Sequence, residues 1–271
     1  MRRIATALSA AALAATLGAC SQGGSPAGPD NNAGDNAGSS ITDISSLVNA
    51  AKTNMDEKKT VTVTFEGTGP LAQLYTSMKC QVDAAAEAMG CSGGPSEMVV
   101  TAEGIFMKSP EMAQLAGGGP SKPWLKMPAN DETAQQFGEL GKISDFEAML
   151  PPGSTITSTA EEQVNGKDAT RYEITTNLQE AASAATTDAQ KQGFKLMLDS
   201  GVTEIKQTVW VDSDKLPLQV KMTTPAMNIQ GQQIPETTLT VHYSDWGKPV
   251  TITAPPADQV QEMPSMPGMP G

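Results

Sequence analysis

Histidine is almost absent from this chain, which contains one, His242, among 271 residues. Zinc ions in proteins are bound mainly by histidine and cysteine. The three cysteines of this chain are assigned below to a lipid anchor and a disulfide. The G-x-S-x-G elbow of lipases and the S-x-x-K motif of penicillin-binding proteins are also missing. His242 lies between Val241 and Tyr243 in a predicted strand, so its side chain points to the opposite face from these two apolar residues. We therefore predict that His242 faces solvent. We therefore expect no catalytic residue, no metal site and no cofactor.

Positive charge is scarce as well. The chain has 18 Lys and Arg against 30 Asp and Glu, a formal net charge of -12. Loss of a signal peptide with Arg2 and Arg3 would leave 16 basic residues. Nucleic acids and anionic lipid heads both attract basic surfaces. We expect no nucleic-acid partner, and we interpret the acidic charge as a source of solubility.

A long apolar run is missing too, because residues 4–17 form an uncharged stretch of only 14 residues behind Arg2 and Arg3. Such a stretch is too short to cross a bilayer and is typical of a secretory signal peptide, here residues 1–19. The quartet Leu17-Gly18-Ala19-Cys20 resembles the bacterial lipobox. The resemblance implies that Cys20 becomes the first mature residue and carries a diacylglyceryl group, whose two acyl chains anchor it firmly to a membrane. The alternative is an ordinary secreted protein with a chance cysteine.

Composition divides the rest of the chain into three parts. Residues 20–40 carry the lipidated cysteine and then Gly, Ser, Asn, Ala and Pro, which predicts a disordered tether. Residues 254–271 are rich in Pro and Met and are expected to be a disordered tail. Residues 41–253 are enough for one core and show neither a repeat nor a break in composition, so we expect a single domain.

Cys80 and Cys91 are an even pair in an exported chain, where oxidation is allowed. We expect a disulfide. A continuous helix through the alanine-rich segment between them would separate their Cα atoms by about 16 Å, beyond disulfide reach. The bridge therefore requires a shorter helix or a loop that doubles back.

Alternation of apolar and polar residues predicts an antiparallel sheet. It occurs at residues 61–67, 169–176, 204–212, 216–222 and 238–243, and Asn165-Gly166 fits a tight hairpin. Helical spacing is confined to residues 42–58, residues 178–200 and a short piece near 143–150. The expected fold class is α+β, with a large sheet and a few helices against it.

The order of several segments resembles the actinobacterial lipoproteins of the LppX and LprG type, which share the LolA-like fold. These segments are GIFMKSPEM, KPWLKMP, ISDFEAMLPPGS, VNGKDATRYEI, VWVDSDKLPLQVKM and VHYSDWGKPVTITAP. The resemblance implies a curved antiparallel half-barrel with helices on its concave face and an apolar cavity for a lipid or glycolipid. It also implies a non-enzymatic carrier or chaperone, anchored on the extracytoplasmic face of the plasma membrane. An export transporter is a partner that such a carrier could have, and the sequence identifies none.

The predicted cavity residues are those that the alternation and helical spacing point to one side: Leu47, Val48, Ala51, Val61, Val63, Phe65, Tyr172, Ile174, Val209, Val211, Val220, Leu239 and Val241. Fourteen methionines in the mature chain suit a surface that contacts variable apolar ligands. They would equally fill a core that is poor in aromatic residues. The alternative function is an envelope interaction protein with a packed core and no lipid ligand.

Overall fold

The computed structural model describes residues 41–70, 72–110, 122–127, 146–229 and 231–262. These residues belong to one compact unit, Ser40–Gly271. The predicted signal peptide, Cys20 and the tether lie outside the described residues.

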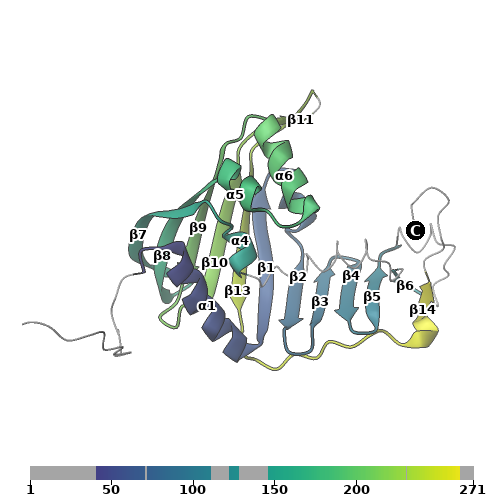
Figure 1. The fold of residues 1–271 in the computed structure, drawn as a ribbon. Coiled ribbons are helices and arrows are strands. Elements are labelled where there is room, and N and C mark those ends of the chain that lie inside the picture. Colours follow the sequence, from purple (N-terminus) through teal and green to yellow (C-terminus); the bar gives the residue numbers. More distant parts are fainter. Residues whose placement is uncertain (1–40, 71, 111–121, 128–145, 230, 263–271) are drawn as a thin grey trace, which may run out of the picture. The chain divides into compact units, whose positions relative to one another are not determined.

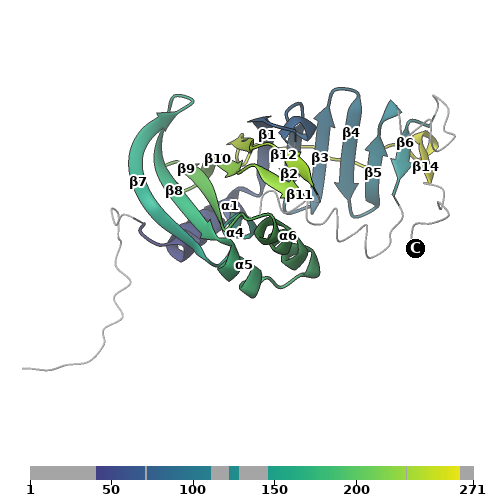
Figure 2. The same cartoon turned by 90° about the horizontal axis from the view of Figure 1, so that it is seen from above.

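A large curved sheet is the centre of the unit (Figures 1 and 2). Its twelve described strands follow the order β14-β6-β5-β4-β3-β2-β1-β13-β10-β9-β8-β7, so the sheet is open at both edges and is not a closed barrel. The strand bounds are β1 Thr60–Thr68, β2 Lys79–Asp83, β3 Ala88–Gly93, β4 Ser96–Thr101, β5 Gly104–Lys108, β6 Trp124–Lys126, β7 Ser154–Val164, β8 Lys167–Asn177, β9 Glu204–Val211, β10 Pro217–Thr224, β13 Thr237–Ser244 and β14 Val260–Glu262. A separate hairpin pairs β11 Met227–Ile229 with β12 Gln232–Ile234.

The described helices lie on the inner side of the curve, over the half of the sheet from β7 to β1 (Figures 1 and 2). Their bounds are α1 Ile44–Lys58, α4 Phe146–Met149, α5 Leu178–Ala184 and α6 Asp188–Asp199, with 3-10 turns η1 Ala72–Leu74 and η3 Ala257–Gln259. The α+β class, the curved sheet and the helices on its concave face are thus as expected.

Local sequence explains the ends of several elements. Asn165 and Gly166 both have positive φ, 53° and 76°, which is the conformation of a two-residue hairpin turn between β7 and β8. Asp43 caps α1, because its side chain accepts a hydrogen bond from the backbone N–H of Ser46 at 2.8 Å. This hydrogen bond is the main reason that the pKa of Asp43 is lower than its ordinary value.

The expected helix over residues 178–200 is two helices instead of one. α5 ends at Ala184, and Thr187 then begins α6 with a capping box, in which the Thr187 side chain accepts from Gln190 N and Gln190 accepts from Thr187 N. The first backbone N–H groups of a helix have no partner within the helix, and this reciprocal pair of hydrogen bonds satisfies two of them. The pair is therefore the mark of a new helix start. The threonine, and not the alanine spacing, decides where the chain breaks.

Two further expectations are corrected at the end of the described chain. Residues 254–271 were expected to be disordered, but residues 257–262 form η3 and β14. β14 pairs with β6 in parallel, so the sheet is not antiparallel throughout. Residues 263–271 of the predicted tail lie outside the described residues, and proline content could not show that Val260, placed beside Trp124, would extend the edge of the sheet.

Candidate functional site

The inner face of the sheet is apolar from one side to the other. Directly paired residues point to the same face of a sheet, so the strand registers define rows across it. One row contains Val63, Cys80, Cys91, Met98, Met107 and Leu125 on β1 to β6. Another contains Phe65, Val241, Val220, Val209 and Tyr172 on β1, β13, β10, β9 and β8. The two rows cover both halves of the sheet without a charged residue.

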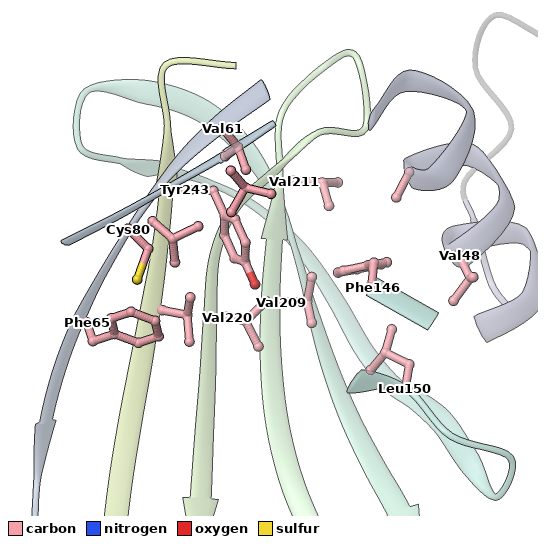
Figure 3. Close-up of a cluster of buried hydrophobic side chains, with 14 of the residues drawn as sticks. Val48, Val61, Phe65, Cys80, Phe146, Leu150, Val209, Val211, Val220 and Tyr243 are labelled. Carbon is pink, nitrogen blue, oxygen red and sulfur yellow. The ribbon is translucent and has the colours of Figure 1, made fainter. Parts of the chain in front are cut away.

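All thirteen predicted cavity residues lie on this apolar inner face or on the helix that covers it. They belong to one hydrophobic cluster, in which twelve are no more than 8% exposed and Leu239 is partly exposed. Figure 3 shows Val61, Val209, Val211 and Val220 from the strands pointing toward Phe146, Leu150 and Val48, which cover them from the helical side. The structure therefore brings the predicted residues together. Their contact with a lipid stays a prediction.

Tyr243 lies within the same cluster and stacks on Trp246, with 6.0 Å between the ring centroids. Its hydroxyl donates a long, weak hydrogen bond to the sulfur of Met149, at 3.5 Å. Complete burial raises the pKa of this hydroxyl well above its ordinary value. Tyr243 is therefore neutral over the whole physiological range and adds no charge to the apolar face.

Methionines line the apolar cluster from the sheet and from the elements that cover it: Met89, Met98 and Met107 are on strands, Met55 is on α1 and Met149 is on α4. Six methionines belong to the cluster or pack against it. Met89 and Met98 are buried, while Met55, Met78, Met107 and Met149 are partly exposed. Four of the six are therefore at the margin of the cluster and not in its packed centre. An unbranched thioether side chain adapts its shape to what it touches, so this margin can fit apolar surfaces of different shapes.

Cys80 and Cys91 are joined by a disulfide, with 2.07 Å between the sulfur atoms. They are directly paired residues of β2 and β3, and the alanine-rich segment between them forms the connecting turn. The chain thus doubles back and does not form the helix considered as an alternative. Both cysteines are buried on the apolar face, at 2% and 5% exposure.

The outer face of the same strands is polar in many places. Arg171 forms ion pairs with Glu162 and Glu173, and the indole of Trp210 donates to Glu162. His242 lies on this face as predicted, but it does not face solvent freely: its side chain is mostly buried, and its buried Nε2 lies 3.4 Å from Glu66 Oε2. A hollow of about 470 Å³ opens on the outer face of β2 to β4, under residues 251–253. The two faces therefore differ in polarity, and the inner face is the candidate site.

Sequence reasoning missed the half of the apolar inner face on β2 to β5. Val82, Met89, Met98 and Val100 belong to this half or pack against the cluster. Cys80 and Val82 alternate within KCQVD, and Met98 and Val100 within SEMVV, so the signal was present. These segments are only five to six residues long, and the alanine-rich turn beside them has helical character.

None of the described helices is both long and apolar enough to cross a bilayer. Within the described ranges, no three or more His, Cys, Asp or Glu side chains are grouped so that they could hold a metal ion.

Comparison with known proteins gives similarities only among solved structures. No protein-family model matches the chain, and no curated protein matches it. The lipoprotein LppX from Mycobacterium tuberculosis is 16% identical, with 78% of this chain and 100% of that chain covered and a TM-score of 0.45. LprF from Mycobacterium bovis is 14% identical, with 79% and 99% covered and a TM-score of 0.43. A LolA superfamily protein from Nitrosomonas europaea is 10% identical, with 76% and 93% covered and a TM-score of 0.25.

One of these solved structures is a lipoprotein and another is a member of the LolA superfamily. Identities this low leave the ligand of this chain to be inferred from its own residues.

Proposed function

We propose that this chain is a membrane-anchored lipoprotein that binds the acyl chains of a lipid or glycolipid on the apolar inner face of its sheet. In this proposal it acts as a carrier or chaperone in the cell envelope and performs no catalysis. Cys20 attaches it to the extracytoplasmic face of the plasma membrane, and residues 21–40 link the anchor to the folded unit.

The observation that carries the proposal is the apolar inner face with its methionine margin. A sheet face that only supports helices needs apolar residues where the helices lie. Here the apolar rows continue onto β2 to β5, beyond the strands over which the described helices lie (Figures 1 and 2). Methionines at the margin suit acyl chains, which are flexible and vary in length.

Val99 and Val100 offer a matched test of this proposal. They are neighbours on β4, both partly exposed, and they point to opposite faces. Val100 packs against the apolar cluster, whereas Val99 lines the hollow on the outer face. The substitutions Val100→Asp and Val99→Asp place the same charge on the same strand. Binding of the fluorescent apolar probe N-phenyl-1-naphthylamine should be lost in Val100→Asp and retained in Val99→Asp. Equal binding by both variants would refute a site on the inner face.

The anchor is tested separately. Cys20→Ala should release the protein from membranes or leave it as an unprocessed precursor, as seen by cell fractionation. Normal processing and normal membrane retention of this variant would show that Cys20 is not the anchor.

A second candidate function is favoured by the burial of the predicted cavity residues. Val63, Val209 and Val211 are 0% exposed and are packed as the centre of a core. A protein with only this core would bind another envelope protein and no lipid. In that case N-phenyl-1-naphthylamine would not bind even to the parent chain.

A further inference from the structure

Gln207 is the largest of the buried polar side chains that interrupt the apolar inner face, the others being Thr176 and Thr237. Gln207 is on β9, where it pairs directly with Ile174 on β8 and Met222 on β10. It points to the same face as Val209, two residues further along the strand. Leu239 and Ile156 extend the same row on either side. Gln207 is thus surrounded across the sheet by apolar residues.

The amide oxygen of Gln207 is buried and accepts no hydrogen bond from any described residue. The residue as a whole is 6% exposed. Buried polar side-chain atoms nearly always have a partner, and a native exception calls for an explanation. Thr176, on the same face, shows the usual arrangement, because its hydroxyl lies 2.8 Å from the hydroxyl of Ser154. Among the described residues the same absence is found for four other buried side-chain atoms, of which Thr237 Oγ1 also lies on the inner face, but only Gln207 has an amide between Ile174 and Met222.

Gln207 also marks the border between two apolar clusters. Ile174 belongs to the main cluster with α1 and residues near α4, whereas Met222 packs against the second cluster, which contains residues from α5 and α6. Met222 and Leu239 are only partly buried. A molecule that lies along this row would meet apolar side chains on both sides and one unpartnered acceptor between them.

We infer that Gln207 is a specificity-determining residue, whose amide oxygen accepts a hydrogen bond from a hydroxyl group of the bound lipid. The inference rests on the proposed function and narrows its ligand. A lipid with a free hydroxyl next to its acyl chains can donate this bond, whereas a fully esterified neutral lipid or a hydrocarbon has no donor. The apolar face binds the chains, and Gln207 selects the lipids that carry a donor.

A pair of probes isolates the donor. 1-Dodecanol and dodecyl methyl ether have the same alkyl chain and one oxygen each, but only the alcohol can donate a hydrogen bond. Their affinities for the full-length chain in detergent are measured by displacement of N-phenyl-1-naphthylamine. The two probes also differ in their free energy of transfer from water to an apolar site. This difference is the same for both proteins, so the ratio of the two affinities is compared between the parent and Gln207→Met. Methionine is of similar length and has no amide.

The preference for the alcohol over the ether should fall about two- to tenfold in Gln207→Met, the range expected for one hydrogen bond. Thr176→Val, which changes a buried polar group that has a partner, should leave the ratio unchanged. Thermal unfolding gives a second measurement. Gln207→Met should melt no lower than the parent without ligand, because it removes a buried unsatisfied acceptor.

The outcomes separate the two proposals. If both probes bind and the ratio is the same in the parent and in Gln207→Met, the role of Gln207 is refuted and lipid binding stands. If neither probe displaces the fluorophore from the parent, both proposals fail. If Gln207→Met melts well below the parent, the side chain has a structural role and the inference is overturned.

Discussion

Gly67 and Ala72 approach each other so closely that a Cβ atom on Gly67 would lie 2.6 Å from the Cβ of Ala72 and 2.3 Å from the carbonyl oxygen of Thr238. The glycine on β1 thereby lets η1 rest directly on the sheet. Gly67→Ala should lower the free energy of unfolding by about 1 to 3 kcal/mol, because backbone has to move to make room. Urea unfolding followed by circular dichroism measures this loss.

Gly193 provides a control of opposite sign. It lies within α6, and a Cβ added there meets no heavy atom within 4 Å. Gly193→Ala should stabilise the protein by about 1 kcal/mol through helix propensity. Equal effects of the two substitutions would contradict the close contact between β1 and η1.

The disulfide between Cys80 and Cys91 closes a short loop, because the two residues are 11 positions apart. Its removal should lower the free energy of unfolding by about 3 kcal/mol, since the unfolded chain gains conformational freedom. The double variant Cys80→Ala/Cys91→Ala is compared with the parent in urea. Mass spectrometry of the non-reduced protein should show the cross-linked peptides, and free thiols at both positions would refute the bridge.

The N-cap of α1 gives the stability of the protein a dependence on pH. The pKa of Asp43 is lower in the folded chain than its ordinary value of 3.8, mainly because of the hydrogen bond from Ser46 N–H. The charged cap therefore stabilises the fold fully above about pH 4 and loses this effect as the pH falls through the lowered pKa. Asp43→Ala should be less stable than the parent at pH 7, and the difference should shrink in acid. A difference that is constant with pH would contradict the charged cap.

The sequence predicted five of the long strands and missed the short ones, and it also missed β7, whose 11 residues are mostly polar and have no fully buried side chain. β1, β8, β9, β10 and β13 were all expected, because each has eight or more residues with one buried face. β2 to β6 have three to six residues, too few for a period to stand out from chance. A strand this short forms because it pairs with neighbouring strands. Those strands can be distant in the sequence, so the local sequence does not predict it.

The candidate site shows the same division. The alternation placed Val209 and Val220 on one face correctly, because period two alone decides which face a strand residue occupies. It could not identify Gln207 as significant. A glutamine within a strand is unremarkable until the registers put Ile174 and Met222 beside it.

Packing differs between the centre and the margin of the apolar face. Val209 is 0% exposed and lies between Tyr172 and Val220. Val209→Trp should therefore lower the free energy of unfolding by about 1 to 3 kcal/mol or more, because the larger side chain overpacks the core. Met107 is partly exposed at the margin, so Met107→Trp should lower the free energy of unfolding by less than Val209→Trp does. Thermal melting of the two variants compares them. A larger loss at Met107 would contradict an adaptable margin around a packed centre.

The proposed function is tested most directly by native mass spectrometry of the full-length chain, purified from the cells that express it without added lipid. We predict a population whose mass exceeds that of the chain with its covalent anchor by the mass of one lipid, and this population should disappear in Val100→Asp but persist in Val99→Asp. A single mass that equals the anchored chain alone, with no increase when lipid is supplied, would contradict lipid binding.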